Sequence, residues 1–386
     1  MTMVENKDKK VLNVPNLRFK EFEGEWEEKR LSDIADLSKG IGISKDQLSA
    51  DGEPCILYGE LYTKYKSETI KEVISKTNID NTKLVKSKAN DVIIPCSGET
   101  AEEIATARCV LKDDILLGGD LNIIRLHGYD GSFMSYQLNG KRKYDIAKVA
   151  QGVSVVHLYG EHLKNIKTIN PSLNEQKKIA NLLFLLDDRI STQNKIIEDL
   201  KKLKSAISER LFKDAKGDVI TLSEICDIVK GEQINGELLS EHGKYYVMNG
   251  GTDPSGYYDN YNVGAYTISI SEGGNSCGYV QFNKCPFWCG GHCYSIQNIA
   301  DNINNLYLYH YLKTEEKAIM KLRIGSGLPN IQKKDLATFK IKLPTSKQQK
   351  AISDILSLLE QKAEIEEQIL IAMQDEKQYL LRQMFI

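Results

Sequence analysis

The 386-residue sequence has no run of about 18 apolar residues, the length that a membrane-spanning helix requires. Its first ten residues are mostly polar and lack the apolar stretch of a secretory signal. A large net charge is also missing: at −2, the total gives no global sign of a polyanionic partner. We therefore expect a cytoplasmic protein that does not contact membranes and that would bind nucleic acid only through positive charge that is local or comes from other subunits.

Signatures of several catalytic sites are missing as well. The sequence contains no Gly-x-x-x-x-Gly-Lys-Ser/Thr, no Gly-x-Gly-x-x-Gly and no Asn-Pro-Pro-aromatic motif of amino-methyltransferases. Carboxylates are abundant, but they do not cluster with histidine in a pattern typical of acid–base chemistry. We therefore predict a protein that binds and positions other molecules, with no catalytic residues and no cofactor of its own.

A zinc-binding Cys-x-x-Cys pair is also absent, although the chain has eight cysteines. Cys285, Cys289, His292 and Cys293, with Cys277 upstream, could supply soft ligands to a metal ion. The same segment has the pattern of strands in which free cysteine serves as a small apolar residue. We predict reduced thiols and no metal site, and a metal-dependent enzyme built on these residues is the less favoured alternative.

What the sequence does contain is a duplication. Residues 31–40 match residues 222–231 at a constant offset of 191, beginning Leu-Ser-Asp-Ile in one copy and Leu-Ser-Glu-Ile in the other. Residues 171–179 match residues 344–352 at an offset of 173. The two halves therefore share their ends and differ by 18 residues in between. This pattern indicates one frame that carries two unlike inserts and binds two different things in one geometry.

The chain divides into five segments. We predict an N-terminal arm over residues 1–29, a first variable domain over 30–170, a spacer helix over 171–216, a second variable domain over 217–343 and a C-terminal spacer helix over 344–386. The arm carries enough apolar residues to pack against the rest of the molecule but not to form a core. Short β-prone runs separated by glycine-rich turns make both variable domains α+β, with loops that suit binding residues.

Both spacer segments open with helix-capping signals. Ser172 with Glu175, and Thr345 with Gln348, are spaced as capping boxes. A helix over 174–211 would be about 57 Å long at 1.5 Å per residue, longer than one domain, and could hold two domains apart.

Downstream of each cap, apolar residues recur at the 3-4 spacing of a coiled coil. In the first helix these are Ile179, Leu182, Leu186, Ile196, Leu200, Leu203 and Ile207, interrupted by Arg189 and Gln193. In the second they are Ile352, Ile355, Leu359, Ile369, Met373 and Leu380, interrupted by Lys362 and Glu366 at equivalent positions. A core-facing amphipathic helix would give a similar stripe, but the shared phase and matching breaks favour a paired-helix spacer.

These segments together resemble the specificity subunits of type I restriction-modification systems. The resemblance covers nearly the whole chain and rests on the arm at 15–26, on the two domain openings and on the track from Gly325 through Pro344 to Ile352. The first half follows the same track from Gln151 to Ile179. It departs from the pattern where Val155-Val156-His157 replaces Leu328-Pro329-Asn330.

The resemblance implies an α+β protein with two tandem α/β target recognition domains in a pseudo-two-fold arrangement, separated by two long antiparallel coiled-coil helices. Each domain would read one half of a bipartite double-stranded DNA target. The implied partners are two modification (methyltransferase) subunits, which would carry S-adenosylmethionine and methylate adenine, and restriction (translocase and nuclease) subunits that use ATP and Mg²⁺. None of these cofactors is expected on this chain. A non-catalytic coiled-coil scaffold for other proteins is the main alternative, favoured by the slightly negative net charge.

Side chains that reach base edges in a groove are chiefly Arg, Lys, Asn, Gln, Ser and Thr on loops. In the first domain our candidates for DNA contact are Ser97, Arg125, Lys141, Arg142, Gln151 and Ser154. In the second domain they are Asn249, Asn275, Lys321, Arg323, Ser326 and Asn330. For the spacer and for subunit binding we nominate Leu182, Leu186, Ile196, Leu200, Leu203, Ile355, Leu359, Ile369 and Met373.

Overall fold

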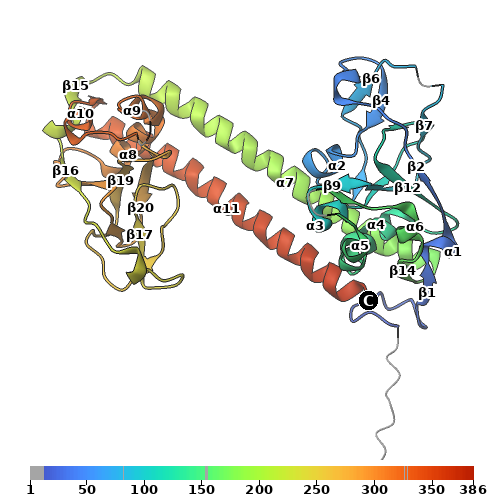
Figure 1. The fold of residues 1–386 in the computed structure, drawn as a ribbon. Coiled ribbons are helices and arrows are strands. Elements are labelled where there is room, and N and C mark those ends of the chain that lie inside the picture. The colour runs from blue at the N-terminus through green and yellow to red at the C-terminus, as the bar shows by residue number, and fades with distance from the viewer. Residues whose placement is uncertain (1–12, 81, 153–154, 326, 328) are drawn as a thin grey trace, which may run out of the picture. The chain divides into compact units, whose positions relative to one another are not determined.

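A computed structural model describes residues 13–80, 82–152, 155–325, 327 and 329–386 (Figure 1). The chain forms two compact units: the first contains residues up to Gln193 together with Ile369–Ile386, and the second contains Asn194–Gln368. Two long helices, α7 (Leu173–Asp214) and α11 (Ser346–Met384), contribute a part to each unit. Each unit therefore combines one α+β domain with a segment of both helices.

The first domain is built on two five-stranded sheets. The larger has the order β2 (Ala35–Lys39), β12 (Leu121–Leu126), β8 (Asp91–Pro95), β10 (Arg108–Val110) and β5 (Thr69–Ile70), and only the pair β10–β5 is parallel. The smaller has the order β3 (Leu48–Ser49), β6 (Ser75–Thr77), β4 (Glu53–Ile56), β11 (Leu116–Leu117) and β7 (Val85–Lys86). Two-stranded pairs join β1 (Glu27–Arg30) to β14 (Lys167–Asn170) and β9 (Ser97–Gly98) to β13 (Val156–His157).

Strand β8 separates two hydrophobic cores of this domain. Its residues alternate between faces, as strand geometry requires. Val92 and Ile94 pack with Met134 and other residues on one side, whereas Ile93 packs in the core of the smaller sheet. The short helices of the domain are α1 (Leu31–Ile34), α2 (Glu60–Thr63), α3 (Ala101–Ile104), α4 (Gly131–Asn139), α5 (Lys143–Val149) and α6 (Gly160–Lys164).

The second domain has a simpler sheet arrangement. Its main sheet has the order β16 (Asp227–Lys230), β22 (Cys293–Gln297), β19 (Thr267–Ser271) and β20 (Val280–Asn283), all antiparallel. A three-stranded sheet joins β18 (Tyr257–Tyr258), β17 (Tyr245–Met248) and β21 (Trp288–Cys289), and β15 (Asp218–Thr221) pairs with β23 (Lys340–Leu343). Its helices are α8 (Asn305–Thr314), α9 (Glu316–Met320) and α10 (Lys333–Ala337).

The duplicated sequence folds alike in both domains. Leu31 and Leu222 are fully buried, each in a short helical turn that leads into the first strand of its main sheet. The ribbon β1–β14 then delivers the chain to α7, and the ribbon β15–β23 delivers it to α11.

A buried glutamine fixes the start of each long helix. Gln176 donates to the carbonyl of Pro171 and accepts a hydrogen bond from the backbone N–H of Asp130. Gln349 does the same with Pro344 and Asn304. Since Asp130 and Asn304 cap the N-termini of α4 and α8, each glutamine ties a long helix to the main helix of its domain.

Only part of each predicted capping box is present. Ser172 and Thr345 accept long hydrogen bonds, of 3.4 Å, from the backbone N–H groups of Glu175 and Gln348. The carboxylate of Glu175 is instead held by both Nε and Nη2 of Arg18, at 2.7 and 2.8 Å. The described part of the arm packs as expected: the Trp26 side chain is 2% exposed and meets Phe133 edge-on.

The same aromatic contact closes both units. In the first, Phe385 near the end of the chain stacks on Phe133 of α4 in a cluster that includes Ile179 and Leu183 of α7. In the second, Phe212 of α7 packs edge-on against Tyr307 of α8, together with Ile352 and Leu356 of α11. The residues of the long helices correspond at the offset of 173. Because the start of one helix meets the end of the other in each unit, the helices are antiparallel, and the predicted fold class is confirmed.

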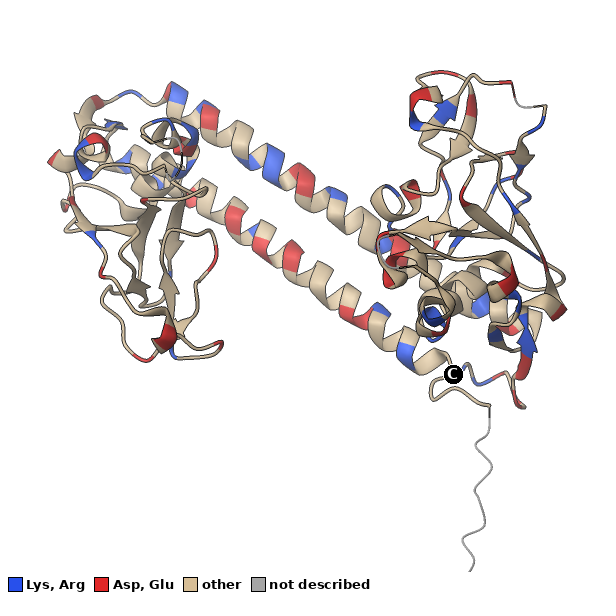
Figure 2. Ribbon diagram, viewed as in Figure 1, with Lys and Arg blue, Asp and Glu red and all other residues tan. Residues whose placement is uncertain are grey.

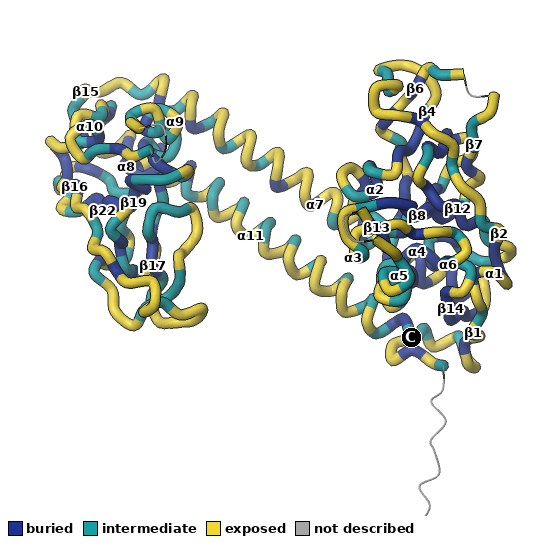
Figure 3. The backbone as a smooth tube through the Cα atoms, viewed as in Figure 1, coloured by how far each residue is buried: buried dark blue, intermediate teal, exposed yellow. Residues whose placement is uncertain are grey.

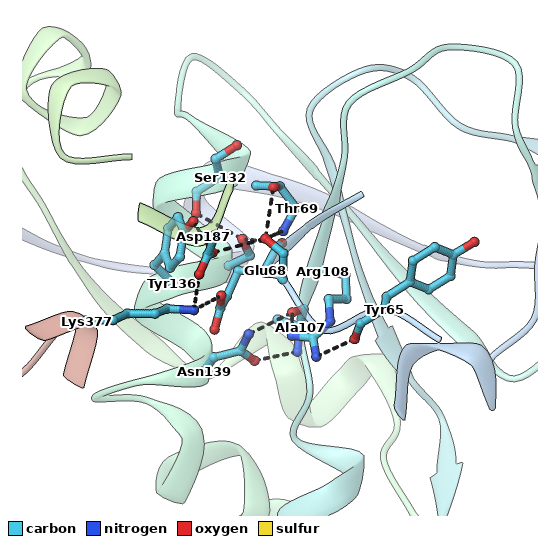
Figure 4. A network of polar contacts seen from close by, with 12 residues as sticks. Tyr65, Glu68, Thr69, Ala107, Arg108, Ser132, Tyr136, Asn139, Asp187 and Lys377 are labelled. Atoms are coloured by element: carbon cyan, nitrogen blue, oxygen red, sulfur yellow. Dashed lines mark hydrogen bonds and ion pairs between the residues drawn. The ribbon is translucent and has the colours of Figure 1, made fainter. Parts of the chain in front are cut away.

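A buried ion pair of the first unit has a half-buried counterpart in the second unit at this offset. In the first unit Lys377 of α11 lies 2.6 Å from Asp187 of α7 and 2.7 Å from Glu68 (Figure 4). The Tyr136 hydroxyl of α4 donates to Asp187 at 2.7 Å. Burial disfavours the charge of Lys377, but Glu68 and Asp187 outweigh it and raise the pKa of its ammonium group.

The second unit repeats this contact with other residues. Lys204 of α7 lies 3.2 Å from Glu360 of α11, which also accepts a hydrogen bond from Tyr309 of α8. His310 occupies the place of Tyr136, and Lys201 pairs with Glu367 at 2.7 Å. In this unit α11 carries several acidic residues and α7 several lysines, and residues of the opposite charge lie between them on both helices (Figure 2).

The buried face of each helix lies one residue away from much of the predicted stripe. Ile196 and Leu203 are 39% and 49% exposed, while Ile197, beside Ile196, is 6% exposed. Asp187 is buried next to the half-buried Leu186, and Figure 3 shows that buried, half-buried and exposed positions alternate along both long helices. Ile196 and Leu203 thus lie outside the buried face, because that face includes charged residues that an apolar pattern cannot reveal, and their nomination stays a prediction.

The stripe of the second helix behaves in the same way. Ile355 and Ile369 are 44% and 38% exposed, whereas Leu356 is fully buried. The other nominated positions, namely Leu182, Leu200, Leu359 and Met373, are half-buried. Their predicted role in subunit binding stays a prediction.

Removal of the Lys377 charge provides a test of the buried ion pair. Lys377→Met would leave Glu68 and Asp187 without their ammonium partner, so we expect the free energy of unfolding to fall by about 3–5 kcal/mol. Urea denaturation at pH 7 measures this change. Lys362→Met, on an exposed lysine of the same helix paired with Glu366, should cost less than about 0.5 kcal/mol. Equal losses in the two variants would contradict the assignment.

His310 makes stability depend on pH. Burial lowers its pKa from 6.5 to about 4, with Glu360 opposing the shift. Because the pKa is lower in the folded state, protonation of His310 favours the unfolded chain. The stability that neutral His310 allows is therefore fully present above pH 6.5, and the free energy of unfolding falls as the pH drops from 6.5 to 4. We expect a loss of about 3 kcal/mol over that range. His310→Tyr, which copies the first unit, should remove this component, and identical pH profiles of unfolding for both proteins would refute it.

Candidate nucleic-acid interface

Two repeated glycines shape the end of each main sheet at which its first strand terminates. A Cβ atom on Gly40 would lie 2.0 Å from the carbonyl oxygen of Gly118, and one on Gly231 would lie 2.3 Å from that of Gly290. No side chain fits at either position, which explains why Lys-Gly ends the first strand of both sheets. The close approach brings a glycine-rich loop beside that strand end in each domain.

A second loop folds back on the same end of the main sheet in both domains. Gln151 and His157 form a bridge in the first domain, as Ile324 and Asn330 do in the second, again at the offset of 173. His157 also pairs with Ser97, beyond the end of β8. Asn330 correspondingly pairs with Gly273, beyond the end of β19. The loops that carried the resemblance therefore meet the central strand end in both copies.

In the first domain this arrangement brings Ser97 and Gln151 together. Gln151 is exposed, whereas the side chain of Ser97 is largely buried, with its carbonyl accepting a hydrogen bond from Tyr62 at 2.9 Å. Ser97 lines a groove of about 1210 Å³ with Tyr58, Tyr62 and Val155 among its walls. Such a groove offers apolar contact as well as backbone and hydroxyl groups.

In the second domain the structure gathers more of the predicted residues. Asn249 accepts a hydrogen bond from the backbone N–H of His292, and Gly274 donates to Pro329, which places Asn275 beside Asn330. Asn275, Arg323 and Asn330 are exposed in this group of loops. Exposed amide side chains such as those of Asn275 and Asn330 can form paired hydrogen bonds with a base edge, while arginine can bind bases or phosphates.

Other predicted residues lie elsewhere or have other partners. Arg125 binds Asp91 with two hydrogen bonds of 2.9 and 2.7 Å, which stabilises the sheet and leaves less of its guanidinium for DNA. Arg142 donates to Asp145 and to the carbonyl of Ile386. Lys141 and Lys321 are exposed, outside the loop bridges described above. Ser154 and Ser326 lie outside the described residues.

Sequence reasoning missed an exposed group next to the first loop pair. The rings of His157 and Tyr159 stack with centroids 6.2 Å apart, and Lys39 Nζ lies 5.6 Å from the centroid of Tyr159. Tyr159 is 45% exposed. A basic residue beside an open aromatic ring suits contact with a base or a phosphate. The duplicated Lys-Gly and the departure from the repeat at His157 were the available signals.

The cysteine-rich segment has the character of a core. Cys277, Cys289 and Cys293 are buried, and only Cys285 of this group is exposed. A hydrogen bond with Cys293, together with burial, raises the pKa of the Cys289 thiol, which disfavours the thiolate that metals bind. Among the residues described, no three His, Cys, Asp or Glu side chains lie close enough to hold a metal ion.

One short motif occurs outside the structural context that its chemistry requires. Gly274–Gly278 spells Gly-x-Ser-x-Gly, the sequence of a nucleophile turn in α/β-hydrolases, where it links a strand to a helix. Here it lies between β19 and β20, two antiparallel strands, so that context is not met. Within the described part of the chain, no helix is long and apolar enough to cross a bilayer.

Known proteins with a similar sequence share this organisation. The model of the type I restriction modification DNA specificity domain matches residues 23–202 and again 216–374. The MjaVIII specificity subunit of a type I restriction enzyme of Methanocaldococcus jannaschii is 26% identical over 395 residues, which cover 90% of each chain. Two Mycoplasma proteins described as type I specificity subunits are 34% and 35% identical, but only 38% and 39% of their lengths are covered.

Solved structures show the same fold. The S subunit of a type I restriction-modification system from M. genitalium superimposes with a TM-score of 0.70 at 22% identity, covering 97% of this chain and 99% of that one. A chain from a study of type I complex assembly gives a TM-score of 0.56 at 16% identity, covering 93% and 97%. With two matches of the family model spanning most of its length, the chain belongs to the type I restriction-modification DNA specificity family.

Proposed function

We propose that this chain is the DNA-reading specificity subunit of a type I restriction-modification complex, in which each domain reads one half of a bipartite target. The observation that carries the proposal is the repeated loop pair, Gln151–His157 with Ser97 and Ile324–Asn330 with Gly273, at the same strand ends of two sheets. Loops at equivalent positions suit two domains that contact DNA in the same way. This agrees with the pseudo-two-fold relation that the sequence predicts.

The two half-sites would differ because the domains differ around this shared position. The first domain adds a five-stranded sheet and the groove beside Ser97. The second adds a three-stranded sheet and presents Asn249, Asn275 and Asn330 together. Base edges in the major groove present distinct donor and acceptor patterns, so unlike side chains on like frames select unlike sequences.

The catalytic steps would belong to partner subunits. Two modification subunits would bring S-adenosylmethionine and methylate adenine in each half-site, and restriction subunits would supply ATP- and Mg²⁺-dependent translocation and cleavage. Several exposed apolar side chains on α7 and α11 offer surfaces for such partners. They are Leu185, Ile196, Leu203, Ile355, Leu358, Ile365 and Ile369.

Methylation sequencing tests the function directly. DNA from cells that express the chain with its modification subunit should carry methyladenine in a bipartite motif with a fixed gap. The motif should vanish when the chain is deleted while the modification subunit remains. A stable complex without any new methylated motif would favour the alternative of a protein-binding scaffold.

Variants at repeat-equivalent positions test the assignment of half-sites. Asn330→Ala should relax the methylated motif in one half only, with a loss of about 1–3 kcal/mol in duplex affinity if its amide reads a base. His157→Ala should relax the other half only. Which half-site each loop reads is measured by sequencing the sites methylated in cells with either variant, and by measuring duplex binding of both variants at one salt concentration. Relaxation of the same half by both variants, or of neither, would refute the pairing of loops with half-sites.

A further inference from the structure

A pocket of about 560 Å³ lies in the first unit at the end of α4, beside the last turns of α11. Arg108, Lys141, Lys143 and Arg382 line it, together with Glu68 and Asn139. The loops that carry Ser97 and Gln151 are not part of its wall. Four cationic side chains thus line one pocket, and of these only Lys141 was nominated from the sequence for DNA contact.

Arg108 is the innermost cation and has no carboxylate as a hydrogen-bond partner in the described structure. Its Nη atoms donate to the backbone carbonyls of Ala107, Leu61 and Tyr65, while its buried Nε has no partner (Figure 4). Burial lowers the pKa of Arg108. A guanidinium held by neutral carbonyls, with N–H donors left over on Nε and Nη1, is suited to receive an anion.

The other charges of the pocket leave an excess of positive charge. Glu68 is its single carboxylate, and that group already binds Lys377 at 2.7 Å. For Lys141, Lys143 and Arg382 no ion pair is found over the described ranges. Exposed lysines alone are usually solvated, but here they surround a partly buried arginine at the mouth of a cavity.

The second unit provides an internal comparison. Its pocket at the equivalent place, about 260 Å³, is lined by Lys201, Lys204, Lys313, Lys317, Glu209 and Glu316. Three of these lysines are paired, Lys201 with Glu367, Lys204 with Glu360 and Lys313 with Glu316. Glu209 stands where the first unit has Arg382, at the offset of 173. The fold that the two units share therefore does not require the positive charge of the pocket in the first unit.

We propose that the pocket of the first unit is a phosphoryl-binding site. The arginine fork and the lysine ammonium groups match the several oxygens of a phosphoryl group, and the volume lies in the range of small-ligand pockets. The phosphoryl group belongs to a free phosphate or mononucleotide, or to the backbone of bound DNA. The proposal itself stands on the first unit alone and does not require the proposed function.

A matched pair of charge reversals tests the site in the full-length chain. Lys143→Glu alters the pocket, and Lys317→Glu makes the same change at the equivalent place in the second unit, counted from the helix caps Asp130 and Asn304. Titration calorimetry with inorganic phosphate and with AMP should show saturable binding that weakens about tenfold or more in Lys143→Glu, as loss of a charge-assisted hydrogen bond predicts. Lys317→Glu should bind as the unaltered chain does.

Salt dependence of duplex binding distinguishes the two sources. If the DNA backbone supplies the phosphoryl group, Lys143→Glu should reduce the slope of log K against log salt by about 0.9 for each DNA phosphate that it no longer neutralises, and Lys317→Glu should not. Phosphate binding with an unchanged slope would assign the site to a free ligand. Equal effects of both variants, or no effect of Lys143→Glu in either assay, would overturn the proposal. Arg382→Glu, on an exposed residue, repeats the test should Lys143→Glu fail to fold.

Discussion

The contact between a lysine of one long helix and an acidic residue of the other, buried in the first unit and half-buried in the second, is the constraint on which both units depend. In the first unit Lys377 joins α11 to Asp187 of α7 and to Glu68 of the domain, so a single ammonium holds three elements. Lys204 and Glu360 take these places in the second. Such a pair contributes modestly to stability when satisfied, but any shift of register would leave buried charges unpaired. It thereby selects one alignment of the antiparallel helices.

This constraint explains where the sequence was informative and where it misled. The N-cap hydrogen bonds of the long helices, the duplication and the α+β character follow from local patterns and are present in the structure, although the capping boxes are incomplete. The phase of the helix–helix seam does not, because Asp187 and Lys377 take buried places that an apolar stripe assigns to residues such as Leu186. Hydrophobic periodicity identifies the helices, yet the charged contact decides which face turns inward.

For the candidate interface, too, some residues could be predicted from the sequence and others could not. Ser97, Gln151, Asn249, Asn275, Arg323 and Asn330 could be nominated because they stand on glycine-rich loops near repeated motifs. Arg125 could not be set aside from the sequence, since its partner Asp91 lies on a neighbouring strand and is brought to it only by sheet pairing. Tyr159 was missed for the same reason, because its nearness to Lys39 and His157 arises from how loops meet.

The contacts that hold the long helices to each domain are separate from the loops that we propose read DNA. The repeated contacts involve the long helices with α4 or α8, through pairs such as Phe133 with Phe385 and Tyr307 with Phe212. The sheets that differ between domains, one with five strands and one with three, take no part in those contacts. A change of side chains on the loops therefore alters what a domain can read without removing a contact that holds the helices. The opposite charges of Arg382 and Glu209 show that this frame also accepts different surface chemistry at one equivalent position.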